Sequence, residues 1–285
     1  MEAIAKNVYI EDRYLGVTLG VITQPRGLVL IDAPPSPEDS RSWRASLMGM
    51  GNGIERVLIN LDSHPDRTLG ARAMDCTVIA HEKTAFAFRN RPNTFKAQGD
   101  ETGANWEAIP GLGSVRWAPP EISFVETMTL YWSDTPILLE SHPGPTRGAI
   151  WVILPGEKIL FVGDGVIKGQ PPFLAHSDLP AWLESLDLLQ TKYKGYTVVS
   201  GRGGVVTPQA VKHQAVVLKK ILDKLEKHGK KRSSTANVDK LAEPLLKEFK
   251  APAARHKQYA QRLRYGLHHY YVRNYLSSSR HAMDE

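Results

Sequence analysis

The stretch Arg56-Val-Leu-Ile-Asn-Leu-Asp-Ser-His-Pro-Asp-Arg-Thr-Leu-Gly-Ala71 decides how this chain folds. Its first residues are aliphatic and β-branched, which predicts a buried strand over Arg56–Ile59. Polar and charged side chains follow that strand at once, from Asp62 to Arg67. Because ligands of α/β sheets gather outside the carboxyl ends of strands, these side chains are the first candidates for a functional site.

Seven further short runs have the same character and are bounded by Gly, Pro or a polar residue. They predict strands at Val17–Thr23, Gly27–Ile31, Thr77–Ala80, Pro136–Leu139, Ala149–Leu154, Lys158–Val162 and Thr197–Val199. Runs that are apolar almost throughout are typical of sheets covered on both faces by helices. We expect those helices at Pro37–Gly49, after Thr68, at His81–Phe88 and at Leu179–Lys192. Asp178 is the expected N-cap of the last one. This order predicts a layered α/β sandwich.

Two segments lie outside this pattern. Residues 89–121 are rich in proline and glycine without a clear period, which predicts an irregular excursion that forms a lid or pocket wall. Beyond Thr207 the pattern is helical, over Pro208–Lys227, Asn237–Phe249 and Ala253–Leu276. An apolar stripe from Tyr259 to Tyr271 needs a partner surface. We therefore predict a core domain over residues 1–207 and a helical extension over residues 208–285 packed on it.

The segment Arg56–Ala71 resembles the strand and H-x-H-x-D-H signature of the metallo-β-lactamase superfamily. Four further segments resemble the family's other motifs in the family's order: Gly27–Asp32, Ser141–Gly148, Phe161–Asp164 and Gly201–Gly203. The resemblance covers roughly residues 7–210. It implies a four-layer αββα metallo-β-lactamase sandwich, a dinuclear metal site, and hydrolysis by a metal-bound hydroxide.

The family's seven metal ligands are incomplete in this chain. Histidines of the signature fall on Asp62 and Arg67, and two later histidines fall on Pro145 and Arg202. The retained ligands are His64, Asp66 and Asp164. Arginine offers five donors and no lone pair, so Arg67 and Arg202 cannot be ligands.

Our interpretation is that the two arginines replace the second metal ion electrostatically. Asp62, Asp66 and Asp164 would repel one another at the site, and two guanidiniums can compensate them with bidentate hydrogen bonds. The alternative is that an unused site has relaxed into arbitrary polar residues. The gain of two arginines together favours the first account.

The position of the first metal ion keeps only a few side chains that could act as ligands. Asp62, His64 and Asp164 could hold at most one Zn, Fe or Mn ion, and only weakly. His142 could reach the site as a displaced ligand. A lone histidine in a polar loop is more often hydrogen-bonded than metal-bound, so we expect no tightly bound cofactor.

Three functions fit these residues. The first is a hydrolase-like protein that acts on or binds a small anionic metabolite, with His64, Asp66, Arg67 and Arg202 as candidate catalytic residues. Without metal, His64 would be the general base, and Arg67 or Arg202 would stabilise an oxyanion. The second is a non-catalytic ligand-binding pseudo-enzyme. The third, which we favour least, is a nucleic-acid-processing relative.

Composition adds limits. Of the 285 residues, 42% are hydrophobic and 23% are charged, as in ordinary globular proteins. One cysteine, Cys76, allows no intrachain disulfide, and neither a secretion signal nor a membrane span is expected, so a cytoplasmic location is expected. The net charge of +6 gathers between Lys219 and Arg280. On charge alone we do not expect a nucleic-acid partner, because solvated helix faces account for it equally well.

Overall fold

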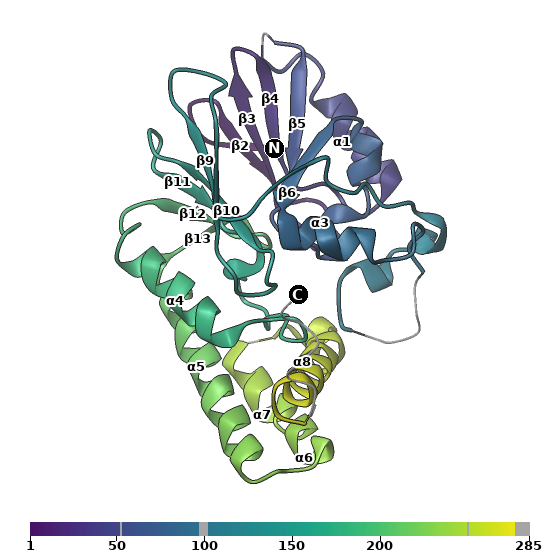
Figure 1. Ribbon diagram of the computed structural model, residues 1–285, viewed down its shortest axis with the longest axis vertical. Helices are drawn as coiled ribbons and strands as arrows, with labels where there is room; N and C mark the ends of the chain where they lie inside the picture. The colour runs from purple at the N-terminus through teal and green to yellow at the C-terminus, as the bar shows by residue number, and fades with distance from the viewer. Residues whose placement is uncertain (52, 97–101, 250, 277–285) are drawn as a thin grey trace.

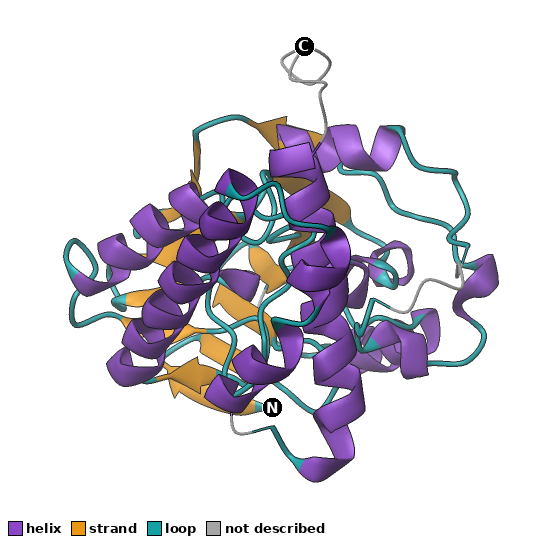
Figure 2. Cartoon of the chain, turned by 90° about the horizontal axis from the view of Figure 1, so that it is seen from below, coloured by secondary structure: helices purple, strands orange, loops and turns teal. Residues whose placement is uncertain are grey.

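Two sheets packed face to face, with helices outside them, form the architecture of this chain (Figure 1). The computed structural model describes residues 1–51, 53–96, 102–249 and 251–276. Helices flank the sheets, and a group of further helices follows toward the C-terminal end of the chain (Figure 2). The predicted αββα sandwich with a C-terminal helical region is therefore confirmed.

The first sheet has seven strands in the order β1-β2-β3-β4-β5-β6-β7. These are β1 (Glu2–Ala5), β2 (Val8–Glu11), β3 (Leu19–Gln24), β4 (Gly27–Ile31), β5 (Glu55–Ile59), β6 (Thr77–His81) and β7 (Ile122–Phe124). From β4 to β7 neighbouring strands run parallel, whereas β1 to β4 are antiparallel. Ile31 pairs with Ile59, and Ile59 pairs with Ile79. The carboxyl ends of three parallel strands therefore meet at one edge.

The second sheet has six strands in the order β13-β12-β11-β10-β9-β8. These are β8 (Thr127–Leu130), β9 (Ile137–Ser141), β10 (Ile150–Leu154), β11 (Ile159–Phe161), β12 (Thr197–Val199) and β13 (Val205–Val206). Only β11 and β12 run parallel to each other; the other neighbouring pairs are antiparallel. Phe161 pairs with Val199, so β11 and β12 also end side by side.

The inner faces of the two sheets share one apolar core. Ile31 and Ile59 of the first sheet belong to one cluster with Val152 and Phe161 of the second. Gly20 in β3 allows this close approach, because a Cβ there would lie 2.6 Å from the Phe161 ring. Burying each such side chain contributes about 2 kcal/mol relative to exposing it. The packed interior therefore fixes the two sheet edges relative to each other.

Helices close the outer layers. Helices α1 (Pro37–Ser46), α2 (Pro65–Thr68) and α3 (Glu82–Arg89) and the 3-10 helix Ala71–Met74 follow strands of the first sheet, and α4 (Leu179–Gln190) follows β11. Trp43 of α1 packs in one cluster with Leu30 and Leu58 of the first sheet. Trp182 of α4 packs in the cluster beneath the second sheet. Asp178 caps α4 as predicted, because its side chain accepts from the Ala181 N–H.

The C-terminal helices share the core of the second sheet. They are α5 (Pro208–Lys230), α6 (Thr235–Asp239), α7 (Ala242–Leu246), the 3-10 helices Lys247–Phe249 and Ala253–Arg255, α8 (His256–Tyr271) and a π-helical turn, Val272–Leu276. Leu218 of α5 and Leu263 of α8 belong to the same cluster as Trp151 and Leu160 of the sheet. The apolar stripe of α8 thus has its partner surface in this cluster. Among the described residues, no helix is both long and apolar enough to cross a membrane.

Some sequence predictions were wrong. The single helix expected over Asn237–Phe249 is divided into α6 and α7, because Pro244 has no N–H to donate to the preceding turn. In place of the helix expected after Thr68, the short helix α2 ends at Thr68 and the 3-10 helix Ala71–Met74 follows it. Strands such as β7 and β8 were not predicted. Their residues are partly exposed and lack the continuous apolar run that identifies a buried strand.

Removing the extension is predicted to destabilise the sandwich, although the domain division at Thr207 itself stays a prediction. Truncation after Thr207 would expose Trp182 and its neighbours on α4, so the remaining chain should lose solubility. As a milder change, Leu263→Ala should lower the free energy of unfolding by about 2–5 kcal/mol, measured by urea denaturation. An equally soluble and equally stable truncated chain would refute the shared core.

Candidate active site

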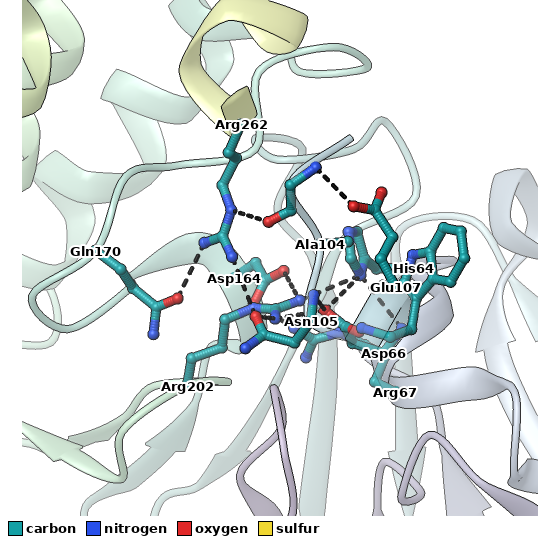
Figure 3. Close-up of polar contacts among 12 residues, drawn as sticks. His64, Asp66, Arg67, Ala104, Asn105, Glu107, Asp164, Gln170, Arg202 and Arg262 are labelled. Carbon is teal, nitrogen blue, oxygen red and sulfur yellow. Dashed lines mark hydrogen bonds and ion pairs between the residues drawn. The ribbon is translucent and has the colours of Figure 1, made fainter. Parts of the chain in front are cut away.

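The candidate site lies where four strands end. Asp32 follows β4, Asp62 follows β5, Asp164 lies in a 3-10 helix (Gly163–Gly165) after β11, and Arg202 follows β12. Both sheets therefore deliver polar side chains to the same edge of the sandwich (Figure 3).

Asp32 fixes the first turn of this edge. It adopts a left-handed backbone with φ of 57°, which aspartate tolerates better than most residues. Its N–H donates to the Ile59 carbonyl, and its Oδ1 accepts from the Leu61 N–H at 2.9 Å. The side chain is fully buried. The second carboxylate oxygen of Asp32 is thereby held toward the interior of the site.

Arg67 reaches three carboxylates at once. Its Nη1 donates to Asp32 Oδ2 at 2.7 Å, its Nε lies 3.0 Å from Asp62 Oδ1, and its Nη2 pairs with Asp164. Arg67 is fully buried. A Cβ at Gly201 would lie 2.8 Å from both terminal nitrogens of Arg67, so a residue without a side chain is needed there. The backbone is therefore shaped around this guanidinium.

Arg202 forms the second half of the network. Its Nε and Nη2 donate to the two oxygens of Asp164 at 2.9 and 3.1 Å, in the bidentate geometry that arginine favours. Its Nη1 donates to Asp66 Oδ2 at 2.6 Å and to Asn105 Oδ1 at 3.2 Å. Its Nη2 also lies 3.1 Å from His64 Nδ1. Asp164 thus joins the two arginines.

The charges of the network support one another. Burial disfavours the cation of Arg67, but the surrounding carboxylates outweigh burial and raise the pKa of Arg67 well above its usual range. Burial likewise disfavours the anion of Asp164, yet the Arg202 and Arg67 guanidiniums hold the pKa of Asp164 below its usual range. Burial raises the pKa of Asp32 to about 7, although Arg67 opposes that shift. Asp164 therefore stays ionised at the centre of the network.

His64 is neutral in this setting. Burial, followed by the positive charge of Arg202, lowers the pKa of His64 to about 3. Its Nδ1 accepts from the Asp66 N–H as the N-cap of α2 and faces the Arg202 guanidinium. The proton of the neutral ring therefore belongs on Nε2. The side chain is 15% exposed, and its ring centroid lies 4.3 Å from that of Phe173.

The excursion and the last helix cover the network. Backbone N–H groups of Asn105 and Trp106 donate to the two oxygens of Asp66 at 3.3 and 2.5 Å. Arg262 of α8 donates to Asn105 Oδ1 at 3.0 Å and to Gln170 Oε1 at 2.9 Å (Figure 3). Burial, followed by the charge of Arg202, lowers the pKa of Arg262 to about 9. The C-terminal helix is thereby tied to the site.

All six predicted site residues come together here. They are Asp62, His64, Asp66, Arg67, Asp164 and Arg202. His142 does not join them, because its Nε2 lies 3.2 Å from Glu140 Oε2 and its ring stacks on Trp151. Phe173 lies against His64, whereas Trp106 and Trp117 pack around Phe95.

Three members of the network had no role in the prediction from sequence. Asp32 ended one of the strand motifs at this edge, but neither a metal-binding nor a catalytic role was assigned to it. Arg262 lies between Tyr259 and Gly266 within the apolar stripe of α8, and a charge in that position was a usable signal. Asn105 gave no signal, because the excursion that carries it has no period.

The side chains at this edge do not form a ligand set that fits a metal ion. The carboxylate oxygens that face its centre accept from guanidinium N–H groups, which are donors only. Over the ranges that the structure describes, no group of three or more His, Cys, Asp or Glu side chains is arranged to hold a metal ion.

Loss of the buried Arg67 charge should lower the free energy of unfolding far more than loss of an exposed arginine charge. Arg67→Met would leave buried carboxylates unpaired, so the free energy of unfolding should fall by about 3–5 kcal/mol. Arg26→Met is the matched control, because the Arg26–Glu55 pair is half exposed and should be worth less than about 1 kcal/mol. Chemical denaturation of both variants is the measurement, and equal losses would contradict the role of Arg67.

Comparisons with known proteins agree with this architecture. A family model described as "Metallo-beta-lactamase superfamily" matches residues 63–201. No curated protein matches the sequence. A metallo-beta-lactamase from Pontibacter korlensis is similar in structure, with a TM-score of 0.61 and 20% identity over 76% of this chain and 97% of that one.

Two further solved structures are similar. DIM-1 metallo-beta-lactamase has a TM-score of 0.60 and 17% identity, over 77% of this chain and 95% of that one. A double mutant of the sec-alkyl sulfatase PisA1 has a TM-score of 0.65 and 14% identity, over 95% of this chain and 49% of that one. At these identities the structures show the fold alone. Together with the family match over residues 63–201, they show that this chain has the metallo-β-lactamase fold and resembles that superfamily over its central part.

Proposed function

We propose that this protein is a non-catalytic member of its superfamily, in which two guanidinium groups have replaced the metal cations and whose activity is the binding of an anionic ligand. One observation carries the loss of metal-dependent catalysis: Arg67, fully buried, contacts the carboxylates of Asp32, Asp62 and Asp164 at once. A cation that pairs with several converging carboxylates does what a metal ion does electrostatically. It cannot bind and activate a water molecule as a Lewis acid does.

Burial supports a structural role for the network. Arg67 and Asp66 have no exposed surface, and Asp62, Asp164 and Arg202 are at most 2% exposed. A substrate would have to displace hydrogen bonds between opposite buried charges to reach them. Such pairs are costly to separate, because each partner would be left uncompensated. The binding that we propose therefore takes place outside this cluster.

Metal-free hydrolysis is the second candidate, and the geometry favours it less. It needs a general base whose pKa is near the working pH, whereas the pKa of His64 is lowered to about 3. It also needs oxyanion donors that are available to a substrate. The N–H groups of Arg67 and Arg202 that contact carboxylates are already engaged in these ion pairs, so they are not available to a substrate oxyanion.

The metal content of the protein tests the proposal. Purified without chelator, the chain should hold far less than two metal ions, by elemental analysis before and after dialysis against zinc, iron and manganese. Any residual binding should be weak, confined to Asp62, His64 and Asp164, and abolished by His64→Ala. Two tightly held ions per chain would instead make metal-dependent hydrolysis the leading function.

A restored ligand set provides the matched comparison. Combining Asp62→His, Arg67→His, Pro145→His and Arg202→His should raise metal uptake, because Asp62, Arg67 and Arg202 lie together at one edge of the sandwich. The parent chain should hydrolyse none of a panel of esters, thioesters, lactones and phosphoesters, with or without added metal. Turnover that is lost in His64→Ala without added metal would support the second candidate and contradict ours.

A further inference from the structure

The charge of this protein is divided unevenly between its two parts. Residues 208–285 contain 17 of the 36 Lys and Arg residues but only 7 of the 30 Asp and Glu residues. The extension is therefore strongly basic, while the sandwich has a small excess of acidic residues. A basic surface of this kind attracts polyanions over distances of about 10 Å at ordinary salt.

Part of this charge lines one groove beside α5. The groove has a volume of about 650 Å³ and runs along α5 as far as Leu241, which precedes α7. Five lysines of α5 and its C-terminal end line it: Lys219, Lys220, Lys224, Lys227 and Lys231. From Lys220 to Lys231 the spacing is three or four residues, and Lys219 precedes Lys220, so the lysines share one side of the helix. The sequence predicted a basic region, but only the fold places these lysines along a groove.

Few of these charges are neutralised. Lys219 lies 2.9 Å from Asp223 Oδ1, and Lys220 pairs with Glu248. Within the described part of the chain, the other three lysines have no carboxylate in ion-pair contact. The groove therefore keeps a net positive charge, and its paired lysines can exchange a carboxylate for another anion because these pairs are exposed.

The residues of the groove indicate what kind of polyanion fits it. No arginine, Phe, Tyr or Trp lines it, and His228 is its one imidazole, so it has few of the groups that read base edges or stack on unpaired bases. Only Val216 and Leu241 are apolar, fewer than the centre of a protein interface requires. From Lys219 to Lys231 the helix rises about 18 Å, which spans several phosphates of one duplex strand at a rise of about 3.4 Å per nucleotide along the duplex axis.

We propose that the α5 groove binds the phosphate backbone of a nucleic-acid duplex without reading its sequence. This proposal replaces the expectation from charge alone, which predicted no nucleic-acid partner. It rests on the proposed function, the binding of an anionic ligand, and identifies that ligand as a nucleic-acid duplex. Metal content and hydrolysis test the arginine cluster, whereas duplex binding tests the groove, so the two ideas can fail separately.

Fluorescence anisotropy with labelled 20-base-pair DNA and RNA duplexes of unrelated sequence is the test. Both duplexes should bind, with affinities that depend little on sequence. The logarithm of the binding constant should fall linearly with the logarithm of salt concentration, with a slope of about −3 to −4 for three or four phosphate contacts. Binding confined to one sequence, or affinity independent of salt, would contradict backbone recognition.

Charge variants locate the surface. Lys227→Glu with Lys231→Glu should weaken duplex binding about tenfold or more, and Asp223→Asn, which frees Lys219, should strengthen it. The control is Lys6→Glu with Lys194→Glu, an equal charge change at exposed positions on the sandwich. It should change affinity far less than the groove variant. Equal weakening by both pairs would overturn the assignment to the groove.

Two further outcomes would overturn the proposal. Absence of duplex binding at 50 mM salt would remove it outright. Binding of polyglutamate in preference to duplexes would point to an acidic protein partner. All substituted lysines are exposed, so circular dichroism and the melting temperature should match those of the parent chain in every variant.

Discussion

The pairing of Arg67 with three buried carboxylates is the constraint on which this edge of the molecule depends. Asp32, Asp62 and Asp164 come from the ends of strands in both sheets, and a single guanidinium holds them together. Without a cation, their mutual repulsion and their burial would each oppose folding. The fold thus needs a positive charge at this point, and arginine provides one that does not depend on metal supply.

The second arginine connects this pairing to the rest of the chain. Arg202 joins Asp164 to Asp66, and the backbone of the excursion caps Asp66 in turn. Asn105 accepts from both Arg202 and Arg262, so the last long helix is linked to the strand ends through one amide oxygen. The guanidinium groups of Arg202 and Arg262 lie 4.5 and 4.1 Å from the ring of Phe173. The extension is thereby part of the closed site as well as of the apolar core.

The sequence was informative where a residue type has few possible roles. Two arginines at the family's ligand positions predicted that guanidinium groups would pair with the aspartates of the site. The reason is that a guanidinium group donates hydrogen bonds and has no lone pair for a metal ion. Helix caps and buried strands followed from local pattern. The sequence could not reveal contacts between segments without periodicity, such as Asn105 with Arg262. It also could not identify strands like β7, whose residues are half exposed, or the placement of basic residues along a groove.

We propose that guanidinium groups occupy the place of the metal ions. Crystals soaked in zinc, with anomalous diffraction recorded at the zinc absorption edge, provide the sharpest measurement. No anomalous peak is expected among Asp62, Asp66 and Asp164, and Arg67 and Arg202 should still be hydrogen-bonded to them. Two strong peaks between these carboxylates, with both guanidinium groups displaced, would contradict it.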